Sequence, residues 1–200
     1  VTVWLGPKLH VVSYPVRGGE SLNVVAIVQN SRQELMHGAL EDWDHAANAE
    51  DLRSHLAHAH PALQDLIAAI PAWRLWMLCD RRPLDDARQM AHGRVALVGD
   101  AAHPMLPYLA QGAGMAIEDA AELERLFAQA AEVGGKVLDL PVLLHRYALN
   151  RWQRNARVQQ RAIRNGNIFH LSGPMAWARD SAMRLLGERL LDLPWLYRGA

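Results

Sequence analysis

The chain has 200 residues, half of them hydrophobic, and its 21 Lys and Arg residues balance its 21 Asp and Glu residues. A formal net charge of zero provides no overall field that would draw the protein to nucleic acid or to a membrane surface. The single cysteine, Cys79, excludes an internal disulfide, and no apolar run approaches the ~20 residues of a membrane span. We therefore expect a globular, cytoplasmic protein.

The N-terminal part of the chain predicts strands followed by helices. Short β-branched runs separated by glycine turns are typical of a hairpin or meander, and they occupy residues 1–5, 10–16 and 22–28. From about Asn48 to Ile70 the apolar residues recur at spacings of three and four, which predicts helix, and Pro61 is expected to begin a second short helix. Residues 73–79 are expected to return to a strand.

The rest of the chain predicts one more strand and then helices. The apolar run 94–99 is typical of a buried parallel strand. A loop rich in proline and glycine follows, and apolar spacing then predicts helices over 115–133, over 141–164 and in the tail. We interpret the chain as α+β, or mixed α/β, in three parts: residues 1–80, 81–135 and 136–200.

Residues 93–114 combine an acid, prolines and small residues in a pattern that suits a ligand site. Asp100 follows the predicted strand, and ligands of open α/β sheets bind at that end of the strands. A carboxylate there is placed to accept hydrogen bonds from the hydroxyls of a sugar or polyol. Gln111-Gly112-Ala113-Gly114 then begins a helix, where small residues let backbone N–H groups approach a ligand and the helix dipole favours negative charge.

This stretch is not a nucleotide phosphate loop. It lacks the Lys-Ser/Thr ending of a P-loop, and Gly112-Ala113-Gly114 does not complete a GxGxxG motif because residue 117 is Ile. On spacing alone, an ordinary loop followed by a capped helix is an open alternative.

A family resemblance adds to this interpretation. The run Gly99-Asp100-Ala101-Ala102-His103-Pro104, with Pro107, Gln111 to Gly114 and the acidic residues Glu118-Asp119, resembles the second FAD motif of the FAD-dependent aromatic-ring hydroxylases. These class A flavoprotein monooxygenases include para-hydroxybenzoate, salicylate and 3-hydroxybenzoate 6-hydroxylases. The similarity covers essentially the whole chain and is strongest to the salicylate and 3-hydroxybenzoate branch, with further matches at residues 4–7, 14–19, 80–84, 158–159 and 164–166.

The resemblance implies FAD as cofactor, with NAD(P)H and O2 as co-substrates for hydroxylation of a small aromatic compound. Asp100 would bind the ribityl chain of FAD, and Pro107 would line the space where flavin, oxygen and substrate meet. The isoalloxazine ring would lie against Pro104, Gln111, Gly112, Ala113 and Gly114. The implied fold is part of a substrate-domain β-sheet, the C-terminal part of a Rossmann-like FAD domain, and C-terminal helices.

The resemblance also implies three residues that act on the substrate. His10 and Tyr14 match a histidine and a tyrosine that lie four residues apart on a strand in the closest branch, and residues at that spacing share a face. His10 would be the base that deprotonates a phenol, while Tyr14 and Gln111 would orient the substrate by hydrogen bonds. Without the resemblance, a half-exposed strand histidine and a core tyrosine are equally good interpretations.

Other polar groups favour structural roles. His55, His58 and His60 do not form the i, i+4 pair of a zinc site and are interpreted as a solvated face. His103 is expected to support local structure. The arginines of the predicted helix 141–164 could indicate nucleic-acid binding, but zero net charge and the lack of interleaved aromatic residues favour a solvated or salt-bridged face.

The sequence lacks the first FAD motif of the family, GxGxxG, and its middle Asp-Gly motif. We therefore expect the C-terminal half of such an enzyme, which binds FAD weakly by itself and whose partner is a missing N-terminal half. A homodimer is also possible, with interface anchors at Trp152, Trp177 and Trp195. The alternatives are a split or non-catalytic remnant, or a related flavin enzyme such as a phenazine-type hydroxylase or a halogenase.

Overall fold

The computed structural model describes residues 1–29, 45–47, 49–78, 80–132, 139–187 and 192–197, so Cys79 lies outside the described residues. The chain divides into two compact units, one formed by residues 1–77 and 167–197 and the other by residues 78–166. The expected boundary after residue 80 falls near the junction of the two units. The residues of the expected third part, 136–200, are divided between them.

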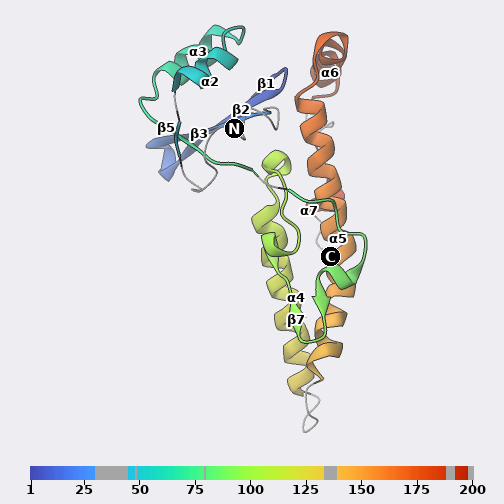
Figure 1. Cartoon of the computed structure of the whole chain (residues 1–200). Helices are drawn as coiled ribbons and strands as arrows, with labels where there is room; N and C mark the ends of the chain where they lie inside the picture. The colour runs from blue at the N-terminus through green and yellow to red at the C-terminus, as the bar shows by residue number, and fades with distance from the viewer. Residues whose placement is uncertain (30–44, 48, 79, 133–138, 188–191, 198–200) are drawn as a thin grey trace. The chain divides into compact units, whose positions relative to one another are not determined.

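The first unit contains a three-stranded antiparallel sheet in the order β1-β2-β3 (Figure 1). Its strands are β1 (Thr2–Gly6), β2 (Leu9–Val16) and β3 (Ser21–Val28). The turn between β2 and β3 is the 3-10 helix η1 (Arg17–Gly19), where Gly18 and Gly19 adopt φ values of 69° and 100° that favour glycine. The predicted meander is therefore confirmed.

The two faces of this sheet differ. Leu9 and Val11 of β2 pack against the helices α2 (Ala49–His55) and α3 (Pro61–Ala68), in a core that also contains Leu56, Leu63 and Ile67. Because successive side chains of a strand point to opposite faces, His10, Val12 and Tyr14 lie on the face away from α2 and α3. The two helices, with Pro61 in the first turn of α3, confirm the helical prediction for residues 48–70.

The remaining elements of the first unit are short strands and helices. β4 (His45–Ala47) pairs antiparallel with β5 (Trp73–Leu75), which is shorter than the strand predicted over residues 73–79. The C-terminal part contributes α6 (Gly173–Leu186) and α7 (Pro194–Tyr197).

The second unit is built on two long helices, α4 (Gly112–Glu132) and α5 (Leu140–Phe169), which lie side by side (Figure 1). α5 belongs to this unit as far as Gly166. Short elements precede α4: the 3-10 helices η2 (Ala87–Gln89), η3 (Gly99–Ala101) and η4 (Pro107–Leu109), and the strands β6 (Ala91–His92) and β7 (Val95–Ala96). The core of the unit includes Leu84, Met90, Ala102, Leu126, Leu144 and Tyr147.

The prediction of a buried parallel strand over residues 94–99 is wrong. β7 covers only residues 95–96 and pairs antiparallel with β6, and Val95 is 65% exposed. The reason is the intervening turn, in which Gly93 has a φ of 57° and reverses the chain directly onto β6. An apolar run indicates a strand, but it does not specify the strand's partner.

Helices combined with small antiparallel sheets confirm the α+β class. None of the helices within the described residues is long and apolar enough to cross a membrane.

A close contact joins the loop before α4 to the helix α5. Asn165 Nδ2 donates to the carbonyl oxygen of Tyr108 at 3.2 Å, and a Cβ added to Gly166 would lie 2.6 Å from the Tyr108 ring. Burial, followed by the charge of Asp80, raises the pKa of Tyr108. The absence of a side chain at residue 166 therefore lets η4, which carries Pro107, pack directly on α5.

We expect Gly166→Ala to destabilise the protein by about 1–2 kcal/mol, because overpacking at the Tyr108 ring outweighs the higher helix propensity of alanine. Urea unfolding measures the change. In a Tyr108→Leu background the same substitution should cost less, since the smaller side chain leaves room. Equal destabilisation in both backgrounds would contradict the contact as its cause.

Candidate functional site

Asp100 lies in the tight turn η3, next to the start of α4. The preceding residue, Gly99, has a φ of 59°, and a Cβ there would lie 3.1 Å from Cβ of Ala116, so the turn and α4 are in close contact. Asp100 itself is exposed and forms no hydrogen bond or ion pair with another described residue. A Cβ on Gly112 would lie 3.8 Å from Asp100 Oδ1, which puts the carboxylate beside the N-terminus of α4.

The N-terminus of α4 presents backbone donors with little side-chain cover. Ala110 adopts a left-handed φ of 52°, and the helix then begins with Gly112, Ala113 and Gly114. The first backbone bond into the helix is donated by Met115 N–H to the carbonyl of Gln111, at 2.9 Å. The N–H groups of residues 112–114 have no acceptor within the helix, as at any helix start. Their acceptors must therefore come from outside the helix backbone.

The two prolines of the loop have different environments. Pro104 is half-buried, and its carbonyl accepts a hydrogen bond from Gln159 Nε2 at 3.1 Å. Oε1 of the same glutamine accepts from Leu84 N–H at 3.1 Å, so this buried side chain ties the loop to residues 80–84. Pro107 is exposed at the start of η4. The loop is therefore anchored at Pro104 and open at Pro107.

Asp119 of α4 is completely buried and holds the turn that carries Asp100. It accepts hydrogen bonds from Gly99 N–H at 3.2 Å, Arg151 Nε at 2.8 Å and Asn155 Nδ2 at 3.1 Å, and lies 2.6 Å from His103 Nε2. Burial by itself raises the pKa of Asp119, but the hydrogen bonds from His103, Arg151 and Asn155 outweigh it and lower the pKa to about 2. Asp119 is therefore ionised at neutral pH.

Sequence reasoning did not identify this network, although its members carry a signal. Asp119 occupies the buried stripe of α4 with Met115 and Leu126, and Arg151 and Asn155 occupy the buried stripe of α5. Charged residues at core spacing require partners of opposite charge inside the protein.

His103 and two arginines of α5 have structural contacts. The buried His103 ring binds Asp119, which supports the local structural role. Arg151 and Arg154 both bind the carboxylate of Glu118, at 2.8 and 2.6 Å. The salt-bridged interpretation of the helix is therefore confirmed for these two arginines.

His10 and Tyr14 lie in the first unit, whereas Asp100, Pro104, Pro107 and Gln111 to Gly114 lie in the second. His10 is only 1% exposed, so the alternative of a half-exposed strand histidine is wrong. Its Nδ1 lies 2.9 Å from Nε2 of His170, and its ring packs against the Phe169 ring in a T-shaped arrangement. Burial, and then the neighbouring His170, lower the pKa of His10 to about 4, so its ring is neutral at neutral pH. Tyr14 is half-buried on the same strand face.

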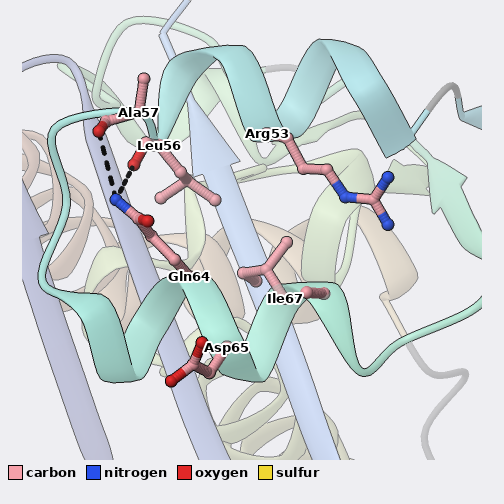
Figure 2. Close-up of a pocket in the computed structure, with 7 residues that line it drawn as sticks. Arg53, Leu56, Ala57, Gln64, Asp65 and Ile67 are labelled. Atoms are coloured by element: carbon pink, nitrogen blue, oxygen red, sulfur yellow. Dashed lines mark hydrogen bonds between the residues drawn. The ribbon is translucent and has the colours of Figure 1, made fainter.

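A pocket between α2 and α3, of about 310 Å³, contains none of these residues (Figure 2). The amide of Gln64 at its edge donates to the carbonyls of Leu56 and Ala57, at 3.2 and 3.1 Å, and so satisfies the end of α2. His60 accepts from Ala62 N–H and caps α3.

No group of three or more His, Cys, Asp or Glu side chains within the described residues is arranged to hold a metal ion.

The observed groups fit the expected FAD. An exposed carboxylate without a partner among the described residues suits the hydroxyls of a ribityl chain, and a helix start without large side chains suits the polar edge of a flavin ring. The hydrogen bond from Gly99 N–H to Asp119 holds the backbone next to Asp100 in place.

We expect Asp119→Asn to destabilise the protein by about 3 kcal/mol, because it removes the fully buried one of the two carboxylates that compensate the buried Arg151. Glu122→Gln is the matched control on the same helix, since Glu122 pairs with Arg125 near the surface and such pairs contribute about 0–1 kcal/mol. Denaturant unfolding of both variants measures the difference. Equal losses would contradict the role of burial.

A comparison of wild type with Asp119→Asn at different pH values tests the charge of Asp119. Its pKa is about 2 in the folded protein, below the ordinary value of 3.8, so its stabilising contribution is present above pH 3.8 and is lost as the pH falls through 2. The stability difference between wild type and Asp119→Asn should therefore shrink over this range. A difference independent of pH would show that the ionised carboxylate is not its cause.

Known proteins resemble the chain over almost its full length. Residues 14–162 match the family model described as FAD binding domain. The chain is 36% identical over 198 residues to 3-hydroxybenzoate 6-hydroxylase 2 of Aquipseudomonas alcaligenes, covering 98% of this chain and 57% of that protein. It is 35% identical over 197 residues to a salicylate hydroxylase of Pseudomonas putida, covering 98% of this chain and 43% of that protein. The solved structure of a salicylate hydroxylase substrate complex matches with a TM-score of 0.79 and 30% identity. The match covers 99% of this chain and 46% of the solved chain.

The chain spans about half the length of the curated relatives it matches. The family model covers most of its residues, including the whole stretch from Gly99 to Asp119. The sequence resemblance is thereby confirmed: the chain belongs to the FAD-binding-domain family of FAD-dependent aromatic-ring hydroxylases.

Proposed function

We propose that this chain contributes to the flavin and substrate sites of an FAD-dependent monooxygenase that hydroxylates a small aromatic compound such as a hydroxybenzoate, using NAD(P)H and O2. The observation that carries the proposal is the exposed carboxylate of Asp100, which lies beside the N-terminus of α4 with no partner among the described residues, next to the hydrogen bond from Gly99 N–H to Asp119. The names of the similar proteins, which are hydroxylases of 3-hydroxybenzoate and salicylate, support the substrate class.

In this proposal Asp100 accepts hydrogen bonds from the ribityl hydroxyls of FAD. The N–H groups at the start of α4, with the positive end of its dipole, favour negative charge on the flavin ring. Gly112, Ala113 and Gly114 allow the close approach, and Pro104 and Gln111 lie against the ring. Pro107 lines the space where flavin, oxygen and substrate meet. When bound, FAD supplies the electron transfer and oxygen activation that hydroxylation requires.

His10 is the proposed base, because its position in a buried site keeps the ring neutral and able to accept a proton. A phenol reacts better as its phenolate, and removal of its proton by a neutral imidazole produces that form. The carboxylate of a hydroxybenzoate would bring a negative charge that raises the pKa of His10 toward the working pH. Tyr14, on the same strand face, and Gln111 are proposed to orient the substrate; the grouping of Gln111 with the other two rests on the resemblance to the hydroxylases.

We expect Asp100→Ala to raise the dissociation constant for FAD about 10- to 100-fold, since hydrogen bonds to a charged acceptor contribute roughly 1.5–3 kcal/mol. Titration of flavin fluorescence measures the constant. Glu124→Ala is the control, because Glu124 is an exposed acid on α4 outside the proposed site. An unchanged constant in Asp100→Ala, with the control also unchanged, would remove Asp100 from the flavin site.

We expect His10→Ala to lower the rate of hydroxylation about 100-fold, the smaller end of the range for a general base, while flavin reduction by NAD(P)H changes little. Rapid-mixing measurements of the two half-reactions separate these effects. His58→Ala, which removes an exposed histidine, should change neither. Equal losses in both half-reactions of His10→Ala would contradict a role as base.

A further inference from the structure

We propose that His170 is a positioning residue that holds the His10 ring in the tautomer with Nδ1 protonated, so that Nε2 is the atom that accepts a proton. This inference rests on the proposed function, in which His10 acts as a base. It assigns to His170 a role that no feature of the sequence suggested.

The two histidines are in direct contact within the first unit. Nδ1 of His10 lies 2.9 Å from Nε2 of His170, and the ring centroids are 5.1 Å apart. The Phe169 ring packs edge-on against His10 at a centroid distance of 5.4 Å. The contact with His170 defines the orientation of the His10 ring. Either Nδ1 of His10 or Nε2 of His170 must carry the proton of this hydrogen bond.

A second hydrogen bond determines which nitrogen carries it. Nδ1 of His170 lies 3.3 Å from the amide oxygen of Gln29, which can only accept. Nδ1 of His170 therefore carries a proton, and in a neutral ring its Nε2 must accept. Consequently His10 donates from Nδ1, and its Nε2 is left unprotonated.

Contacts with the backbone hold Gln29 and the segment before His170 in place. Gln29 donates its N–H to the carbonyl of Lys8 at 2.8 Å, which continues the pairing of β2 and β3 beyond Val28. Directly before His170 in the chain, the carbonyls of Ile168 and Phe169 accept hydrogen bonds from Arg179 of α6 at 3.2 and 2.7 Å. The residues that flank the histidine pair are thus held by the sheet and by α6.

Both histidine rings must be neutral for this pattern of hydrogen bonds, and their surroundings favour that state. Burial and the neighbouring ring lower the pKa of His10 to about 4. Burial and the charge of Arg179 also lower the pKa of His170. A hydrogen bond between two neutral imidazoles then has a single donor, which is the condition for a defined tautomer.

The test uses the flavin-loaded protein labelled with 15N in histidine, because NMR couplings between ring nitrogens and carbon-bound protons identify the tautomer directly. His10→Ala assigns the His10 signals. We expect the wild-type His10 ring to be protonated at Nδ1. A wild-type ring protonated at Nε2 would overturn the proposal.

Two substitutions separate positioning from packing. His170→Gln keeps the pattern, because its amide oxygen can accept from His10 Nδ1 while its NH2 group donates to Gln29, so the tautomer should be retained. His170→Leu removes the acceptor, and the His10 signal should shift toward the Nε2-protonated form. Retention of the wild-type tautomer in His170→Leu, or its loss in a folded His170→Gln, would each overturn the proposal. If His170→Leu does not fold, the wild-type and His170→Gln spectra decide.

Kinetics provide a second readout. His170→Leu should lower hydroxylation about 10-fold or more, as loss of a residue that orients a functional histidine does elsewhere, and leave flavin reduction unchanged. His170→Gln should retain the wild-type rate. If His10→Ala itself leaves hydroxylation unaffected, the proposed base is wrong, while the NMR spectra still decide whether His170 sets the tautomer.

Discussion

The buried carboxylate of Asp119 is the constraint on which the second unit depends. An ionised carboxylate away from water costs several kcal/mol unless charged or polar groups compensate it, and here these groups come from two segments, the loop before α4 and the helix α5. Arg151 and Asn155 set the register of α5 against α4, while Gly99 and His103 bring the preceding turn onto the same side chain. One charge thus organises both long helices and the loop between strand and helix.

The candidate flavin site follows from that organisation. Asp100 is adjacent to Gly99 in the chain, so fixing the backbone of Gly99 also fixes the place from which the exposed carboxylate projects. Asp119 and Asp100 have different roles because one is buried and the other is exposed. Asp119 is fully enclosed by donors and serves structure, whereas Asp100 faces solvent with its acceptor capacity unused by described residues and can serve a ligand.

The histidines of the first unit show how burial changes the chemistry of a residue without changing its type. His10 is enclosed by Phe169 and His170, and loss of solvent favours its neutral form. A neutral imidazole has a defined donor and a defined acceptor, so its hydrogen-bond partner decides which nitrogen is available for chemistry. The exposed histidines near α2 and α3 act instead in local contacts, such as the cap that His60 provides.

The sequence by itself determined the elements and groups that depend on neighbours in the chain. Alternating residues and glycine turns specified the β-meander, Pro61 marked a helix start, and the run from Gly99 to Gly114 identified the flavin motif. Only the tertiary structure decided that β7 folds back on β6, that Asp119 joins α4 to α5, and that His10 meets His170. The last two contacts join residues 36 and 160 positions apart, and no local pattern encodes a partner at that separation, because packing of whole elements brings such residues together.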